Sequence, residues 1–315
     1  MAQDATTIQT IREAAERIAP FVHRTPIFTC LAIDTLLGAT VFLKCENLQK
    51  VGAFKARGAT NAVVLLNNQE RQRGVATHSS GNHAQALAYA AQQHNIACTV
   101  VMPDTSPEIK VRATKGYGAE IVFCENTLVA RETTLANIAN ASNAVVVHPY
   151  DNENVIAGQG TAALELLSDI PDLDVVIAPV GGGGLMSGTA IAARALSPSV
   201  AVLGAEPALA ADAKRSLETG ILQAPFPPKT IADGLRTALS ERTFSYLQKK
   251  DVKVITAEEQ TIMQAMEIFT TRAKLVVEAS AAVPLAALLE HQQWVKGKRI
   301  GMILSGGNRH ITATM

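Results

Sequence analysis

Residues 175–185 read VVIAPVGGGGL, a short apolar run that ends in four consecutive glycines. Residues 175–178 carry no polar side chain, which is typical of a parallel strand buried on both faces. Residues 180–184 would then place many backbone N–H groups between a strand and a helix, an arrangement that binds anions and phosphate above all. A tight turn alone would need only two glycines. The stretch therefore predicts an α/β fold with a phosphate cradle at the carboxyl end of a central strand.

Strand-like and helix-like segments alternate on both sides of this stretch. The sequence predicts strands at residues 39–44, 74–77, 97–102, 120–123, 144–147, 200–205 and 299–304, and helices at residues 6–19, 59–67, 83–94, 160–167, 258–273 and 279–291. Such alternation predicts βαβ units and mostly parallel sheets. No linker rich in Pro, Gly or Ser separates two halves, so we expect a smaller domain inserted in a larger one. The expected boundaries are 1–73 and 150–315 for the large domain and 74–149 for the small domain.

The composition excludes several classes of protein. Of 315 residues, 48% are hydrophobic and 18% are charged, which allows a large core and argues against disorder. The 28 basic residues balance the 28 acidic ones and aromatic residues make up 4%, so nucleic acid and anionic membranes are not expected partners. The four cysteines form no CxxC pair, and neither a signal peptide nor an apolar run of about 20 residues is present. We expect a cytoplasmic protein that acts on small molecules.

Two further loops follow predicted strands, where ligands bind in such folds. Residues 79–83 read SSGNH and offer hydroxyls, an amide and a helix N-terminus, which suit a carboxylate. An N-cap by Ser80 or Asn82 is the structural alternative. Residues 305–308 read SGGN and on their own predict no more than a turn.

Lys55 stands between Phe54 and an Ala-rich segment, which makes it a candidate for a desolvated, nucleophilic amine. Without context it would be an ordinary surface charge. A lysine, a phosphate cradle and a carboxylate loop are together what a pyridoxal phosphate enzyme acting on amino acids requires.

As a set, these motifs resemble the fold-type II pyridoxal phosphate enzymes, in the branch of serine racemase and threonine/serine dehydratase. The matching stretches run in family order along nearly the whole chain: HRTP at 23–26, KCENLQ at 44–49, FKARGA at 54–59, THSSGNH at 77–83, VIAGQGT at 155–161, GGGGL at 181–185, ADG at 232–234 and LSGGN at 304–308. The resemblance implies a tryptophan synthase β-like fold with two domains that each contain a parallel sheet, the smaller inserted in the larger.

The resemblance also implies roles for individual residues. Lys55 would hold the cofactor as a Schiff base and remove the substrate α-proton, and Ser80 would protonate the α-carbon from the opposite face. Many dedicated threonine dehydratases carry alanine in place of Ser80, so the serine favours a racemase, although it could serve the carboxylate alone. The neutral hydroxyl of Ser305 at the pyridine nitrogen would make the ring a weaker electron sink, which suits loss of a β-hydroxyl. The implied cofactor contacts are Phe54, Lys55, Asn82, Gly181, Gly182, Gly183, Gly184, Leu185 and Ser305, and the implied substrate contacts are Ser79, Ser80, Gly81, Asn82 and His83.

A second site is implied at the carboxylates of Glu206 and Asp212 with the carbonyl of Ala210. Oxygen ligands of this kind suit Mg²⁺ or Ca²⁺, with Mn²⁺ as a further candidate. Alternatively, Glu206 could bind a ribose in a nucleotide-dependent oxidoreductase, although the G-x-G-x-x-G spacing fails because its third glycine would fall on Met186 or Ser187. Tyr117 and Gln85 stand where racemases of this branch place an activating nucleotide. A homodimer is the family expectation.

Two departures leave the substrate open. Ala53 replaces the serine of the family's Ser-Phe-Lys, and residues 148–154 read HPYDNEN, which is closer to dehydratases than to mammalian-type racemases. We expect a serine racemase and L-serine/L-threonine dehydratase that interconverts L- and D-serine and releases a keto acid and ammonia. The alternatives are a threo-3-hydroxyaspartate ammonia-lyase, a dedicated threonine dehydratase, a β-replacement synthase and a silent binding protein. No regulatory extension follows residue 308, so feedback by isoleucine is not expected.

Overall fold

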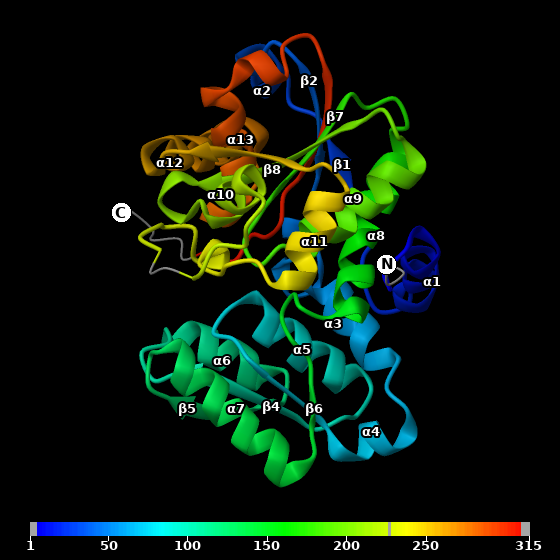
Figure 1. The fold of residues 1–315 in the computed structure, drawn as a ribbon, viewed down its shortest axis with the longest axis vertical. Coiled ribbons are helices and arrows are strands. Elements are labelled where there is room, and N and C mark those ends of the chain that lie inside the picture. Colours follow the sequence, from blue (N-terminus) through cyan, green and yellow to red (C-terminus); the bar gives the residue numbers. More distant parts are fainter. Residues whose placement is uncertain (1–4, 226–227, 310–315) are drawn as a thin grey trace.

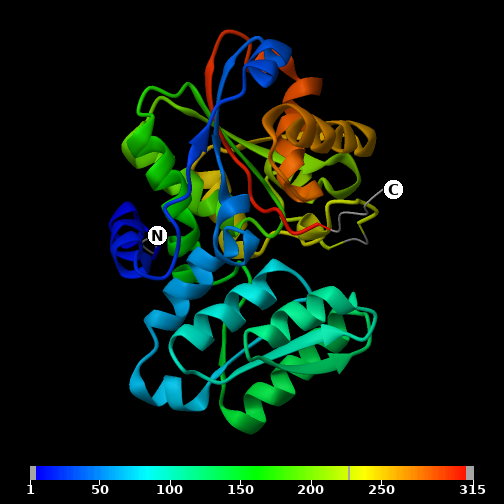
Figure 2. The same cartoon turned by 180° about the vertical axis from the view of Figure 1, so that it is seen from behind.

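In a computed structural model, the structure is described for residues 5–225 and 228–309, and it holds two sheets in separate halves of the molecule (Figures 1 and 2). The strands are β1 (Ile27–Phe28), β2 (Thr40–Lys44), β3 (Val75–His78), β4 (Cys98–Pro103), β5 (Glu120–Cys124), β6 (Val145–Val146), β7 (Val175–Pro179), β8 (Ala201–Pro207), β9 (Lys253–Ala257) and β10 (Arg299–Ile303). The α-helices are α1 (Ile8–Ile18), α2 (Leu31–Leu37), α3 (Lys55–Val64), α4 (Asn68–Arg73), α5 (Asn82–Gln93), α6 (Glu108–Gly116), α7 (Leu128–Ser142), α8 (Glu153–Asp169), α9 (Gly184–Leu196), α10 (Asp212–Thr219), α11 (Glu241–Lys249), α12 (Glu259–Ile268) and α13 (Ala279–Glu290). No described helix is long and apolar enough to cross a membrane.

The larger sheet has six strands in the order β1-β2-β10-β7-β8-β9. All of its neighbouring strands are parallel except β1, which pairs antiparallel with β2 at one edge. Strand β10 lies between β2 and β7, so the last of the described strands completes the centre of the sheet. The carboxyl ends of β2, β7 and β10 therefore meet at one edge, where ligands bind in such sheets.

The smaller sheet has four parallel strands in the order β5-β4-β3-β6. These four strands are consecutive in the chain and lie between β2 and β7 of the larger sheet. Helix α3 packs against both α8 of the large half and α5 of the small half. The predicted α/β class with two parallel-containing sheets is thus confirmed.

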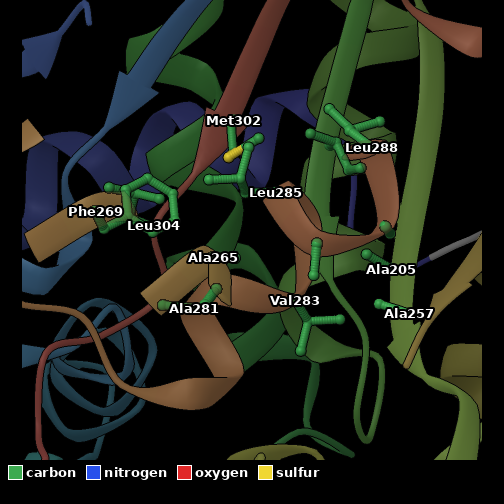
Figure 3. Close-up of a cluster of buried hydrophobic side chains, with 14 of the residues drawn as sticks. Ala205, Ala257, Ala265, Phe269, Ala281, Val283, Leu285, Leu288, Met302 and Leu304 are labelled. Atoms are coloured by element: carbon green, nitrogen blue, oxygen red, sulfur yellow. The ribbon is translucent and has the colours of Figure 1, made fainter. Parts of the chain in front are cut away.

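The core of the large half lies on both faces of its sheet, because side chains of a strand alternate between faces. Val175 and Ile177 belong to a cluster with α2, α12 and α13, whereas Val176 and Ala178 belong to a cluster with α1, α8 and α9. Figure 3 shows the first cluster, in which Met302 of β10 lies beside Leu285 of α13.

Several elements differ from the sequence-based expectation: β1, α2, α4, α10 and α11 were not expected, and the helix expected at 258–273 ends as an α-helix at Ile268. Helix α3 begins at Lys55 rather than at residue 59, and α8 begins at Glu153 rather than at residue 160. Glycines within these segments lowered the expected helix propensity. Strand β9 was not expected, although KVITA at 253–257 has the β-branched residues of a strand.

Candidate active site

The glycine loop joins β7 to α9, as predicted. Gly182, Gly183, Gly184 and Leu185 are buried, yet none of the backbone N–H groups of residues 181–185 has an acceptor in the part of the chain that the structure describes. A row of buried donors without partners is rare in a folded protein, because each one carries a desolvation cost. These donors lie at the N-terminus of α9, where the helix dipole favours an anion. The loop therefore has the chemistry of a phosphate cradle.

Close packing is a second reason why these positions are glycine, and the sequence alone did not indicate it. A Cβ on Gly182 would stand 2.3 Å from the Tyr150 ring, and one on Gly183 would stand 2.7 Å from Leu239. Gly183 also has φ +84°, a conformation that favours glycine. The run of glycines thus serves close contact with Tyr150 and Leu239 as well as anion binding.

Lys55 is the first residue of α3 and contacts the segment between β6 and α8. Its Nζ donates to the carbonyl oxygen of Pro149 at 2.7 Å and lies 5.2 Å from the centroid of the Phe54 ring. Burial lowers the pKa of Lys55 from 10.5 to about 8, against the opposing charge of Glu278. A larger fraction of this amine is therefore neutral near pH 7 than of an exposed lysine.

The loop of residues 79–83 joins β3 to α5, and its Asn82 contacts Glu278 and Asn308 of the large half. Ser79 Oγ accepts from the backbone N–H of Gly81 at 3.2 Å, whereas no described residue is a hydrogen-bond partner of the Ser80 hydroxyl. The N–H groups of residues 82–84 open α5 and have no described acceptor. His83 points away from this loop, because its Nε2 contacts the carbonyl oxygen of Val147 at 3.0 Å and burial holds its pKa well below 6.5. Only the backbone of His83 is placed to contact a carboxylate.

The loop after β10 lies directly beside the Lys55 turn. Phe54 donates its backbone N–H to the carbonyl of Ser305 at 3.0 Å, and Ala53 pairs with Gly306 in an isolated antiparallel bridge. Ser305 is buried, and none of its described neighbours bonds its hydroxyl. The three strand-end loops and Lys55 are thus brought together.

Glu278 also belongs to this group, and sequence reasoning missed it. Asn82 Nδ2 donates to both carboxylate oxygens of Glu278, at 2.8 and 3.1 Å, while Asn82 Oδ1 accepts from Asn308 Nδ2 at 2.9 Å. Burial raises the pKa of Glu278 from 4.5 to about 7. The only sequence signal was an acidic residue before an apolar helix, which also fits the N-cap that Glu278 forms for α13.

Glu206 and Asp212 lie together at the end of β8 and the start of α10. Glu206 accepts backbone N–H bonds from Ala213 at 3.0 Å and from Lys214 at 2.8 Å, and Asp212 accepts one from Leu239 at 3.3 Å. Burial and then the charge of Asp212 raise the pKa of Glu206 to about 8, and burial raises that of Asp212 to about 6. The described residues contain no group of three acidic, His or Cys side chains that could hold a metal. Each oxygen of Glu206 thus accepts one N–H bond from α10 and keeps a lone pair for a further ligand.

Gln85 is buried on α5, and the Tyr117 ring meets Tyr89 edge-on with 5.8 Å between centroids. Their nucleotide role stays a prediction.

Comparison with known proteins adds a consistent result. The family model described as "Pyridoxal-phosphate dependent enzyme" matches residues 18–306. Serine racemase of Dictyostelium discoideum is 45% identical over 306 residues, 96% of this chain and 94% of that protein. The crystal structure of that racemase has a TM-score of 0.93 at 44% identity and covers 97% of this chain and 99% of its own.

Two other similar proteins carry different names. The β-hydroxyaspartate dehydratase of Paracoccus denitrificans (strain Pd 1222) is 45% identical over 302 residues, 96% of each chain. The crystal structure of a threonine deaminase from T.th. has a TM-score of 0.92 at 45% identity and covers 97% of this chain and 99% of its own.

Proposed function

The chain belongs to the family of pyridoxal-phosphate dependent enzymes, and from this premise we propose that it eliminates water from L-serine and L-threonine and interconverts L- and D-serine. The observation that carries the proposal is the desolvated amine of Lys55 beside two rows of backbone N–H groups without described acceptors. One row suits a phosphate and the other suits a carboxylate. The names of the similar racemase and deaminase support the same reaction class.

The residues fit pyridoxal phosphate, because the backbone N–H groups of residues 181–185, four of which are buried residues, lack a described acceptor that a phosphate would supply. The bound cofactor supplies an aldehyde that bonds amines and a ring that accepts electrons from the bond being broken. Gly181, Gly182, Gly183, Gly184 and Leu185 would hold its phosphate. Lys55 would bond its aldehyde, Phe54 would lie beside its ring, Asn82 would face its hydroxyl and Ser305 its pyridine nitrogen.

Two side chains of the protein would each carry out one proton transfer. Lys55 would accept the α-proton through Nζ, whose pKa of about 8 keeps a fraction of it neutral at physiological pH. The Ser80 hydroxyl is free of protein partners among the described residues, so it could exchange a proton at the opposite face of the α-carbon. The N–H groups that open α5, together with Ser79 and Gly81, would orient the substrate carboxylate.

A product assay with matched variants tests this function. Purified enzyme is given L-serine and L-threonine, and keto acid and D-serine are measured together for wild type, Ser80→Ala and Lys55→Ala. We expect Lys55→Ala to abolish both products, and Ser80→Ala to abolish D-serine while keto acid persists. If wild type forms keto acid alone, the protein is a dehydratase and Ser80 serves only the carboxylate.

A second candidate substrate is 3-hydroxyaspartate. Burial lowers the pKa of His78, and the nearby charge of Arg131 lowers it further. His78 is the last residue of β3, directly before Ser79. A guanidinium near this loop would suit a second carboxylate. Two similar proteins are a β-hydroxyaspartate dehydratase and an L-threo-3-hydroxyaspartate ammonia-lyase. In this case Arg131→Met should lower turnover of 3-hydroxyaspartate and spare that of L-serine; equal losses on both substrates would exclude this role.

We also propose a divalent cation, Mg²⁺ first and Ca²⁺ or Mn²⁺ next, at Glu206, Asp212 and the Ala210 carbonyl. Both carboxyl pKa values are raised, so in the metal-free protein the stability they contribute is full at low pH and is lost as pH rises through about 6 and 8. A cation binds the ionised forms, so its stabilisation should grow over the same range. We would measure the unfolding temperature with Mg²⁺ and with a chelator, at about pH 5.5 and at about pH 8.5. The two temperatures should differ only at the higher pH. Glu206→Gln should remove that difference, and its persistence would contradict the site.

Three further properties are proposed with this function. The small domain comprises residues 74–149, and residues 1–73 and 150–315 form the large domain, which agrees with the position of the smaller sheet in the chain. The enzyme is a cytoplasmic homodimer. Tyr117 and Gln85 contribute to an effector nucleotide site.

A further inference from the structure

The turn that leads into Lys55 has a strained backbone. Val51 has φ +53°, a left-handed conformation that is unfavourable for a β-branched residue, and Gly52 follows with φ +68°. Such residues persist only where their surroundings hold them, and they cluster at functional sites. The source of that restraint is therefore informative.

Asn308 supplies the restraint through its side-chain amide. Its Nδ2 donates to the carbonyl oxygen of Val51 at 2.7 Å and to Asn82 Oδ1 at 2.9 Å. A Cβ on Gly52 would stand 2.5 Å from Asn308 Oδ1, so the amide packs directly on this turn. The backbone N–H of Gly307 bonds the Gly52 carbonyl at 2.9 Å and fixes the same pair of loops. One amide thus joins the turn before Lys55 to the first residue of α5.

The same contacts orient Asn82. Its Oδ1 is held by Asn308 and its Nδ2 by the Glu278 carboxylate, so the plane of its amide is fixed at both ends. One lone pair of Oδ1 remains for a ligand. Asn308 therefore acts on both sides of the site, on the backbone that carries Lys55 and on the side chain that would face the ring hydroxyl.

We propose that Asn308 is a positioning residue that holds the Lys55 turn and the Asn82 amide in one fixed relation through its two donated hydrogen bonds. The proposal rests on the roles given above to Lys55 and Asn82. It assigns a function to the last residue of the SGGN motif, which the site otherwise leaves unexplained.

Two substitutions distinguish the hydrogen bonds that Asn308 donates from the packing of its side chain. Asn308→Asp keeps the shape of the side chain and removes both N–H donors, whereas Asn308→Ala removes the amide altogether. Asn67→Ala is the matched control, because it removes a side-chain acceptor that caps α4 on the exposed surface. We expect kcat to fall about 100-fold in both Asn308 variants with KM changed less than about three-fold, since a small displacement of reacting groups is enough for such a loss. Asn67→Ala should leave kcat unchanged.

Hydrogen exchange of the holoenzyme gives a readout besides activity. Peptides covering residues 49–57 and 80–85 should exchange faster in Asn308→Asp than in wild type, while peptides of α12 should not change. The double variant Asn82→Ala/Asn308→Ala should lose less turnover than the two single losses multiplied together, because Asn308 acts partly through Asn82. Normal exchange and turnover in Asn308→Asp, fully additive losses, or the same exchange pattern in Asn67→Ala would each overturn the proposal.

The outcome is distinct from failure of the proposed function. A wild-type protein without a visible cofactor band that depends on Lys55 would defeat the proposed function. The exchange comparison would still decide whether Asn308 holds the two loops together.

Discussion

Two opposing effects set the pKa of the Lys55 amine. Burial disfavours its charged form, whereas the Glu278 carboxylate favours it. The balance leaves the pKa at about 8, near the pH at which a proton-transfer group is most effective. Glu278 thus influences the chemistry of Lys55 through its charge.

This balance can be measured in the cofactor-free protein. The rate of acetylation of Lys55, followed by mass spectrometry against pH, should have its midpoint near pH 8. Glu278→Gln removes the charge that raises the Lys55 pKa, so the midpoint should move to lower pH. Glu267→Gln, at an exposed position on α12, is the control and should leave the midpoint unchanged. A midpoint that moves upward in Glu278→Gln would contradict the account.

Helix α3 is held in place by a buried and charge-balanced group near its start. The guanidinium of Arg57 is fully buried and bonds the carboxylates of Glu46 and Glu165, while Lys44 Nζ bonds Glu165 at 2.5 Å. The group joins β2, α3 and α8. Because Arg57 follows Lys55 by two residues, the same bonds fix the start of the helix that carries the amine.

Breaking this group should be costly. Arg57→Met leaves two carboxylates without their main partner, and loss of one partner of a buried ion pair costs about 3–5 kcal/mol. Lysine should not rescue it, because a single ammonium cannot replace the bidentate guanidinium. Urea unfolding measures both variants. The control is Arg24→Ala, since the Arg24–Asp169 pair is 60% and 40% exposed and should contribute about 0–1 kcal/mol. Equal losses at positions 57 and 24 would contradict this ranking.

The contact between α3 and α8 depends on Gly58. A Cβ there would stand 2.7 Å from the Val155 carbonyl oxygen, which belongs to the backbone of α8 and cannot move alone. Gly58→Ala should therefore destabilise by about 1–3 kcal/mol, even though alanine favours an isolated helix by about 1 kcal/mol. Gly116→Ala, at the end of α6 with open space around it, should be neutral or stabilising. Thermal unfolding of the two variants checks the difference, and stabilisation by Gly58→Ala would show that the helices separate readily.

The sequence largely predicted the order of strands, helices and loops, but it did not predict the contacts between residues far apart in the chain. Parallel strands buried on both faces give continuous apolar runs, so β7 was expected at its observed bounds, and the loops at 79–83, 181–185 and 305–308 were correctly placed after strands. Glu278 and Tyr150 escaped notice because their roles depend on the packing of elements far apart in the chain. The contact of Tyr150 with Gly182 joins residues that no local pattern relates.

The two halves also contact each other through an ion pair. Lys110 of α6, in the small half, bonds Asp233 of the ADG motif, in the large half, and both side chains are partly exposed. An exposed pair adds at most about 1 kcal/mol to stability, so its main effect should be on the relative position of the halves. Lys110→Met and Asp233→Asn should each raise KM for the amino acid several-fold with an unchanged unfolding temperature.

The exchanged pair Lys110→Asp/Asp233→Lys should recover most of that KM, because opposite charges again face each other and the two positions are coupled. Steady-state kinetics at low and high salt checks this. Screening by salt should raise the KM of the wild-type enzyme and leave the KM of Lys110→Met unchanged. Should the exchanged pair bind no better than either single variant, the contact would be a surface pair without influence on the relation of the two halves. A KM that recovers with the exchange would instead mean that this contact holds the small half in its working position relative to Lys55.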